Sequence, residues 1–202
     1  MSVSAAPAVG LTPDQLREIS EARTRVRKIR SAVTLARFDF WGTAIFGGLT
    51  VLGSLVSFSL PGLLLGLAMA AVAYFEHHGA NDLSNLELTA PRRLACNQLF
   101  FAAALLAYAA WTLFYGLNHL EQYTGLIASQ MPPELSDSSM VISINSLTKL
   151  ILILLYGTLA VVALTVQPGT ALFYFSREKH LRAYLSQTPR WILDAQRAGV
   201  SL

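Results

Sequence analysis

The stretch from Phe40 to Phe75 contains no charged residue, and it constrains the fold more than any other feature of the sequence. As a helix it would be about 54 Å long, whereas one crossing of the hydrocarbon core of a bilayer takes about 30 Å. Pro61 and Gly62 lie inside the run and are typical of a turn. The run therefore predicts two membrane-spanning helices in a tight hairpin, with both ends close to the interface.

A second pair of apolar runs follows, from about Asn97 to Leu117 and from about Thr148 to Gln167, joined by a long outer loop over 118–147. Charged residues make up 13% of the chain and hydrophobic residues 53%, whereas soluble chains have about 25% charged residues. We therefore expect an all-α membrane protein with four transmembrane helices.

A short motif, Leu-x7-Pro-Arg-x5-Gln, occurs twice, each time after a pair of apolar runs. A proline in the first turn fixes where a helix begins, and the arginine that follows can reach phosphate headgroups. The motif predicts two tandem hairpins in a parallel repeat, each closed by short juxtamembrane cytoplasmic helices. The two copies consist of Leu83, Pro91, Arg92 and Gln98, and of Leu181, Pro189, Arg190 and Gln196.

The N-terminal segment, 1–38, is expected to hold a disordered tail over Met1 to Gly10 and then an amphipathic cytoplasmic helix. Thr12, Pro13 and Gln15 form a strong helix start with a capping box. The apolar stripe of this helix can pack on the protein's own cytoplasmic side, rest on anionic lipid, or pair with a partner helix. The stripe consists of Ile19, Ala22, Val26, Ile29, Val33, Ala36 and Phe40.

Every lysine and arginine except Lys149 lies before the first span, between the second and third, or after the fourth. The positive-inside rule then predicts that both termini are cytoplasmic. After segment 1–38, the first hairpin with its Pro-Arg segment covers 39–98, and the second hairpin with the C-terminal Pro-Arg segment covers 99–202. The sequence has no acceptor site for N-glycosylation and no signal-like start, so we expect a bacterial inner membrane.

The expected partners are membrane lipid and either other membrane-protein subunits or a second copy of this chain. Nucleic acid is not expected, because the basic residues flank apolar spans as membrane topology requires. Contacts with a partner or with lipid are expected from the N-terminal stripe and the Pro-Arg segments. The candidate contact residues are Ile19, Val26, Ile29, Val33, Arg92, Arg93, Arg190 and Trp191.

Asp39 and Glu76 bracket the first hairpin and should lie at similar depth on the inner side. Ionisable residues within membrane helices are functional by default. These two stand at span ends, where Arg37, Arg92 and Arg93 are available. We therefore predict that they form a buried ion pair with arginine, and a proton or ion pathway is the alternative.

No catalytic motif, phosphate-binding loop or metal-ligand spacing occurs in the sequence, so no enzyme activity, metal or cofactor is expected. The leading hypothesis is a non-enzymatic structural, scaffold or accessory subunit of a larger or homo-oligomeric membrane assembly. One alternative is a small oligomeric transporter or channel with its site at Gln167 and Pro168, where we expect the returning helix to be interrupted. A second alternative is a membrane protein that binds lipid, quinone or pigment.

Overall fold

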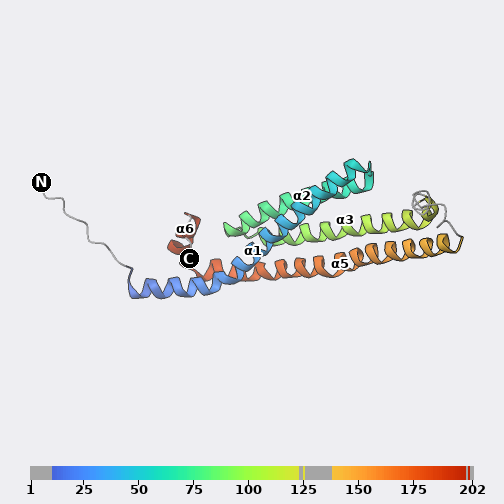
Figure 1. The fold of residues 1–202 in the computed structure, drawn as a ribbon. Coiled ribbons are helices and arrows are strands. Elements are labelled where there is room, and N and C mark those ends of the chain that lie inside the picture. Colours follow the sequence, from blue (N-terminus) through green and yellow to red (C-terminus); the bar gives the residue numbers. More distant parts are fainter. Residues whose placement is uncertain (1–10, 123–124, 126–137, 199, 201–202) are drawn as a thin grey trace.

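The computed structural model describes residues 11–122, 125, 138–198 and 200, and for 138–142 it describes the backbone alone. Four of its helices, taking α5 from residue 143 onward, are long and apolar enough to cross a membrane. They run lengthwise in an elongated molecule (Figure 1). This confirms the expected all-α class with four candidate transmembrane helices, while the tandem-hairpin repeat stays a prediction. The helices are α1 (Pro13–Val56), α2 (Leu60–Ser84), α3 (Ala90–Asn118), α5 (Ser138–Gln187) and α6 (Arg190–Arg197).

Helix α1 begins where the sequence predicts. The Thr12 hydroxyl accepts a hydrogen bond from the Gln15 amide at 3.3 Å, and the Gln15 side chain accepts one from the Thr12 amide at 2.9 Å. The helix then continues without a break to Val56, so the amphipathic helix and the first span are one element. At 1.5 Å per residue α1 is about 66 Å long, about twice the hydrocarbon thickness.

Both expected ends of α2 shift by a few residues. The turn before it lies at 57–59, where Phe58 has a positive φ of 51°. Pro61 therefore falls in the first helical turn, a position that tolerates proline. At the other end the helix runs past the apolar stretch, which stops at Phe75, and ends at Ser84. A Cβ atom on Gly79 would lie 2.5 Å from Leu94 Cδ2, so this glycine makes room for α3.

Helix α5 differs most from the expectation. The predicted interruption at Gln167 and Pro168 is wrong, because α5 is helical from Ser138 to Gln187 with Pro168 inside it. Proline removes one hydrogen bond of the ladder, and the turns on either side hold the helix together across it. The outer loop over 118–147 is correspondingly shorter, and the proline-rich part of that loop, Met131 to Pro133, lies outside the described residues.

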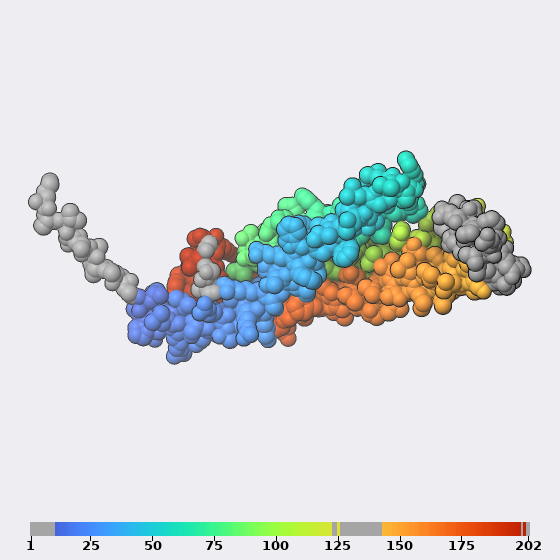
Figure 2. All heavy atoms as spheres, in the orientation of Figure 1, coloured from blue at the N-terminus to red at the C-terminus, as the bar shows by residue number. Residues whose placement is uncertain are grey.

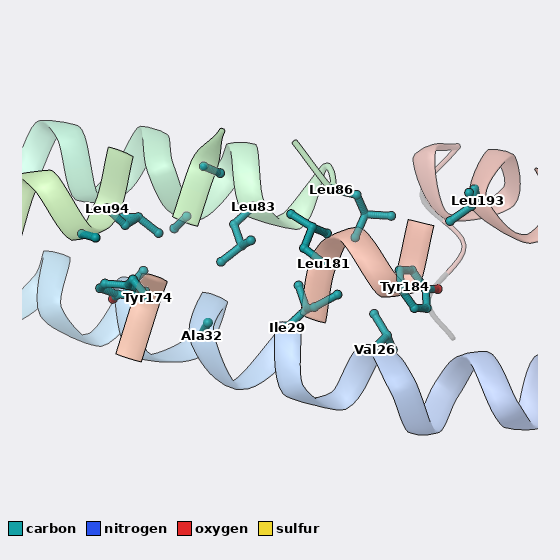
Figure 3. Packing of buried hydrophobic residues seen from close by; sticks show 14 of the residues in the cluster. Val26, Ile29, Ala32, Leu83, Leu86, Leu94, Tyr174, Leu181, Tyr184 and Leu193 are labelled. Carbon is teal, nitrogen blue, oxygen red and sulfur yellow. The ribbon is translucent and has the colours of Figure 1, made fainter. Parts of the chain in front are cut away.

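One end of the molecule collects all the basic segments, and we call it the basic end. Here the N-terminal half of α1, the facing ends of α2 and α3, the C-terminal part of α5 and α6 share one apolar core (Figure 3). Ile29 of α1, Leu181 of α5 and Ile192 of α6 have at most 2% of their surface exposed. The described parts of the three basic segments therefore lie together at this end of the molecule.

The apolar stripe of α1 packs on the protein itself. Ala22, Val26, Ile29 and Ala36 are buried in the core of the basic end, and Ile19 and Val33 pack at its edge. The stripe is thus covered by other helices of the same chain that belong to this core. Val26 and Ile29 are at most 3% exposed, so the prediction that they contact a partner or lipid is wrong.

Polar contacts also join α1 to the C-terminal part of the chain. The Trp191 indole donates a hydrogen bond to Glu18 at 3.1 Å, and the Arg25 guanidinium donates one to the Gln187 carbonyl at 3.3 Å. These contacts lie at the rim of the same core, so the two terminal segments are held together by both apolar and polar contacts.

The two motif copies begin alike and continue differently. Leu83 and Leu181 are both fully buried in the core of the basic end. Pro91 lies in the first turn of α3, which continues for 29 residues, whereas Pro189 caps α6, which has 8 residues. The motif therefore marks a helix start in both places but not the same larger structure.

Close packing of α1 against α2 within the spans depends on glycines. A Cβ atom on Gly66 would lie 2.6 Å from Val51 Cγ2 and 3.0 Å from the Val51 backbone nitrogen, and one on Gly47 would lie 3.0 Å from Met69 Cβ. Gly48, by contrast, faces open space. Gly47 and Gly66 thus allow close approach of the two helices, and Gly48 plays no part in it.

Gly66→Ala is therefore expected to lower the midpoint of thermal unfolding in detergent, because the new methyl group meets the backbone of α1. Gly48→Ala is the matched control, and it should leave the midpoint unchanged or raise it, since alanine favours helix by about 1 kcal/mol over glycine. Equal effects of the two substitutions would contradict the α1–α2 contact described above.

Candidate functional site: a buried carboxylate between four helices

Glu76 has no exposed surface, although it is a carboxylate in a membrane-type helix. Its Oε1 atom accepts a hydrogen bond from Gln98 Nε2 at 2.6 Å and a second from Asn97 Nδ2 at 3.2 Å. Asn97 also donates to the Val72 carbonyl, one turn earlier in α2, at 3.0 Å. The carboxylate is thus held by two neutral amides from the first turns of α3.

Asp39 of α1 joins the same network. Gln98 Nε2 reaches its Oδ2 atom at 3.4 Å as well as the Glu76 carboxylate. One amide nitrogen therefore stands between two carboxylates on two different helices. The prediction that Asp39 and Glu76 lie at similar depth agrees with this arrangement.

Tyr174 brings the fourth helix, α5, to the cluster. Its side chain has no exposed surface, and its hydroxyl lies close to the Asp39 carboxylate. At normal hydrogen-bond geometry this hydroxyl has no partner among the described residues, and neither has the second carboxylate oxygen of Glu76. We call Asp39, Glu76, Asn97, Gln98 and Tyr174 the carboxylate cluster.

Helical periodicity explains why these side chains meet. Buried residues recur along α2 at Val72, Glu76, Gly79 and Leu83, a spacing of three to four that keeps them on one face. On α3, the adjacent Asn97 and Gln98 are both buried on the side that meets this face. Glu76 therefore points into the protein rather than toward the surroundings.

The predicted ion pair with arginine is wrong. Arg93 donates to Asp82 at 3.0 Å and lies 3.7 Å from Glu87, both at the surface. Throughout the part of the chain that the structure describes, no salt bridge includes Asp39 or Glu76. The first turn of α3 directs its arginines outward, while Asn97 and Gln98, more than one turn further along, point inward, so neutral donors reach the carboxylates.

The other candidate contact residues have different surroundings. Arg92 and Arg190 are exposed, and Trp191 is 39% exposed with its indole bonded to Glu18. Together with Arg93 these side chains remain on the surface of the basic end. The expectation of partner or lipid contacts is open for them.

Gln167 and Pro168 lie half-buried within an uninterrupted α5, and neither makes a hydrogen bond to the carboxylate cluster. Among the residues described, no group of three or more histidine, cysteine, aspartate or glutamate side chains could hold a metal ion.

The sequence analysis singled out Asp39 and Glu76 but missed their neutral partners. Gln98 is the last residue of the first motif copy, and Tyr174 is one of the aromatic residues before the second. Gln98 was thus part of the repeat and Tyr174 lay just before it, but nothing in the pattern tied either residue to the two carboxylates.

Family models, curated proteins and solved structures were each compared with the chain, and none of them matches.

Gln98→Leu should destabilise the protein by about 1–3 kcal/mol, because it leaves a buried carboxylate without its shortest hydrogen bond. The measurement is the free energy of unfolding in a mixed-detergent titration. Gln167→Leu is the matched control, because it makes the same exchange outside the cluster, and it should change the free energy by less than half as much. A Gln98→Leu variant with an unchanged free energy of unfolding would show that the amide does not hold Glu76.

Proposed function

We propose that the chain is a non-enzymatic integral membrane protein that acts as a structural, scaffold or accessory subunit of a larger or homo-oligomeric membrane assembly. The observation that carries the proposal is that the four candidate spans are buried by the rest of the chain to very different extents. In the most apolar stretch of each helix, 33% of α2 and 28% of α3 is buried, against 11% of α1 and 6% of α5. The surface of α5 is open along much of its length (Figure 2).

Lipid covers an apolar surface as well as protein does, so the case for a partner needs a second feature. Gly48 and Gly53 on α1 and Gly157 on α5 face open space. Small residues in membrane helices let another helix approach closely. Their positions on the two least-covered helices support contacts with another subunit or a second copy there.

The proposal includes a topology. The basic end would lie in the cytoplasm with both termini, and the membrane would be a bacterial inner membrane. The collection of all three basic segments at one end supports this orientation. The extensive packing of α1 on α2 and of α3 on α5 supports two hairpins, which would stand side by side as a parallel repeat.

Purification in a mild detergent followed by native mass measurement tests the assembly. We expect a particle larger than the 22.0 kDa chain, either a multiple of it or a complex with another membrane protein. Gly157→Leu should reduce the fraction of assembled particle, because the larger side chain blocks close approach at α5. Gly169→Leu also points into open space, but nearer the basic end, and should leave assembly intact. A stable lone monomer under these conditions contradicts the proposal.

A small oligomeric transporter or channel is the second candidate, and the carboxylate cluster is the observation that favours it. Buried ionisable side chains in membrane helices commonly mark ion or proton pathways. The predicted transport site at Gln167 and Pro168 depended on an interrupted helix, and α5 is not interrupted there. Under this proposal Glu76 would carry the transport step.

Proton and sodium fluxes into liposomes decide this alternative. If the chain transports either ion, Glu76→Gln should abolish the flux, because the substituted side chain can no longer carry a negative charge. Gln167→Leu should leave the flux unchanged. The absence of flux in the native protein, or a flux that Glu76→Gln does not alter, rejects the transporter.

A further inference from the structure

The carboxylate cluster has an unbalanced charge. Its two acids come from α1 and α2, while the groups that face them from α3 are the neutral amides of Asn97 and Gln98 and the group from α5 is the Tyr174 phenol. Arg177, three residues after Tyr174 on α5, stacks on the Phe173 ring, with 4.1 Å between its guanidinium carbon and the ring centroid. No cationic side chain of the described residues forms a salt bridge to either acid.

A buried carboxylate is costly unless a positive charge or a sufficient set of hydrogen bonds compensates it. The amide donors satisfy Glu76 Oε1, but the other carboxylate oxygen of Glu76 has no partner at normal geometry. The Tyr174 hydroxyl lies against Asp39, outside the range of a normal hydrogen bond. Two independent observations, the pair of acids and the unpartnered, fully buried carboxylate oxygen of Glu76, point to the same missing component.

We propose that Asp39 and Glu76, with the Tyr174 hydroxyl, form a binding site for one bare monovalent cation, a proton or a sodium ion. This inference rests on the cluster alone and on neither function proposed above, since a bound cation can be structural without being transported. The site would place one positive charge between α1, α2 and α5, beside the amides of α3.

Space and charge set the class of ligand. This carboxylate oxygen of Glu76 and the Tyr174 hydroxyl oxygen each have less than 1 Å² of exposed surface, so a hydrated ion has no room beside them. A proton or a dehydrated sodium ion, which brings no water shell, meets this constraint. One positive charge also leaves at most one net negative charge on the pair, which the two amides can solvate.

Cation-dependent stability tests the site. The full chain in detergent is unfolded thermally in two series: sodium-free buffers of rising pH, and rising sodium chloride at one alkaline pH with choline chloride keeping the ionic strength constant. A cation that binds only the folded state stabilises it with concentration. We expect the midpoint to fall as pH rises if a proton is bound, and to recover with sodium, but not choline, if sodium is bound.

Glu76→Gln and Asp39→Asn should each remove most of this dependence, because each leaves a single carboxylate for the cation. Asp82→Asn is the matched control on α2, where the native carboxylate pairs with Arg93 at the surface, and it should keep the dependence. A native protein indifferent to both cations, or variants at 39 and 76 that respond like the native protein, would overturn the proposal.

A second measurement covers the case in which both variants fail to fold. Infrared spectra of the native protein in light and heavy water distinguish a protonated, water-inaccessible carboxylic acid from an ionised carboxylate, and equilibrium binding of radioactive sodium detects the alkali ion. Either a protonated buried acid or one sodium per chain supports the site. Two ionised carboxylates without bound sodium refute it.

Discussion

The hydrogen bonds that Gln98 donates to Glu76 and Asp39 are the contact on which the arrangement of the helices depends most. They join α1, α2 and α3 at one level, and Tyr174 adds α5 at the same place. A hydrogen bond to a charged group contributes about 1.5–3 kcal/mol, and an unsatisfied buried charge costs more than that. The cluster therefore sets how the four helices are rotated toward one another where the spans meet the basic end.

Two kinds of packing meet at this level. Toward the basic end, leucine, isoleucine and tyrosine side chains of five helices bury each other, as in the core of a soluble domain. Toward the other end, glycines let α1 and α2 approach closely, while most of α5 and much of α1 stay uncovered. Packing at the basic end is driven by the exclusion of water from apolar side chains. Within the spans lipid is as apolar as the side chains, so helices associate through close van der Waals contact instead. The basic end is therefore a closely packed core, whereas the apolar stretches of α1 and α5 leave most of their surface free for lipid or another helix.

Much of the fold could be predicted because it follows from local patterns. Uncharged runs indicate the spans, the Thr12 capping box indicates the start of α1, and the spacing of Ala22, Val26 and Ile29 indicates a buried face. Predictions of where a helix ends or breaks failed where tertiary packing overrides the local preference of a residue. Glycine is typical of a helix end, but Gly79 lies within α2 and leaves room for the Leu94 side chain. Proline is typical of a helix break, but Pro168 lies inside the long helix α5. The hydrogen-bond partners of Glu76 could not be predicted from charge. Arg92 and Arg93 are nearer to Glu76 in the sequence than Asn97 and Gln98, whose side chains donate to it. Which side chains of α3 point inward depends on the rotation of the helix, and no spacing rule within one segment fixes that.

A double-mutant cycle between Glu76 and Gln98 tests the central claim most directly. Glu76→Leu, Gln98→Leu and the double variant would be unfolded in mixed detergent, and their free energies of unfolding compared. If the amide exists to satisfy the buried carboxylate, the double variant should lose less stability than the sum of the single variants, by about 0.5–3 kcal/mol, because no unsatisfied charge remains. Strictly additive losses would show that the two side chains act independently and would contradict the account.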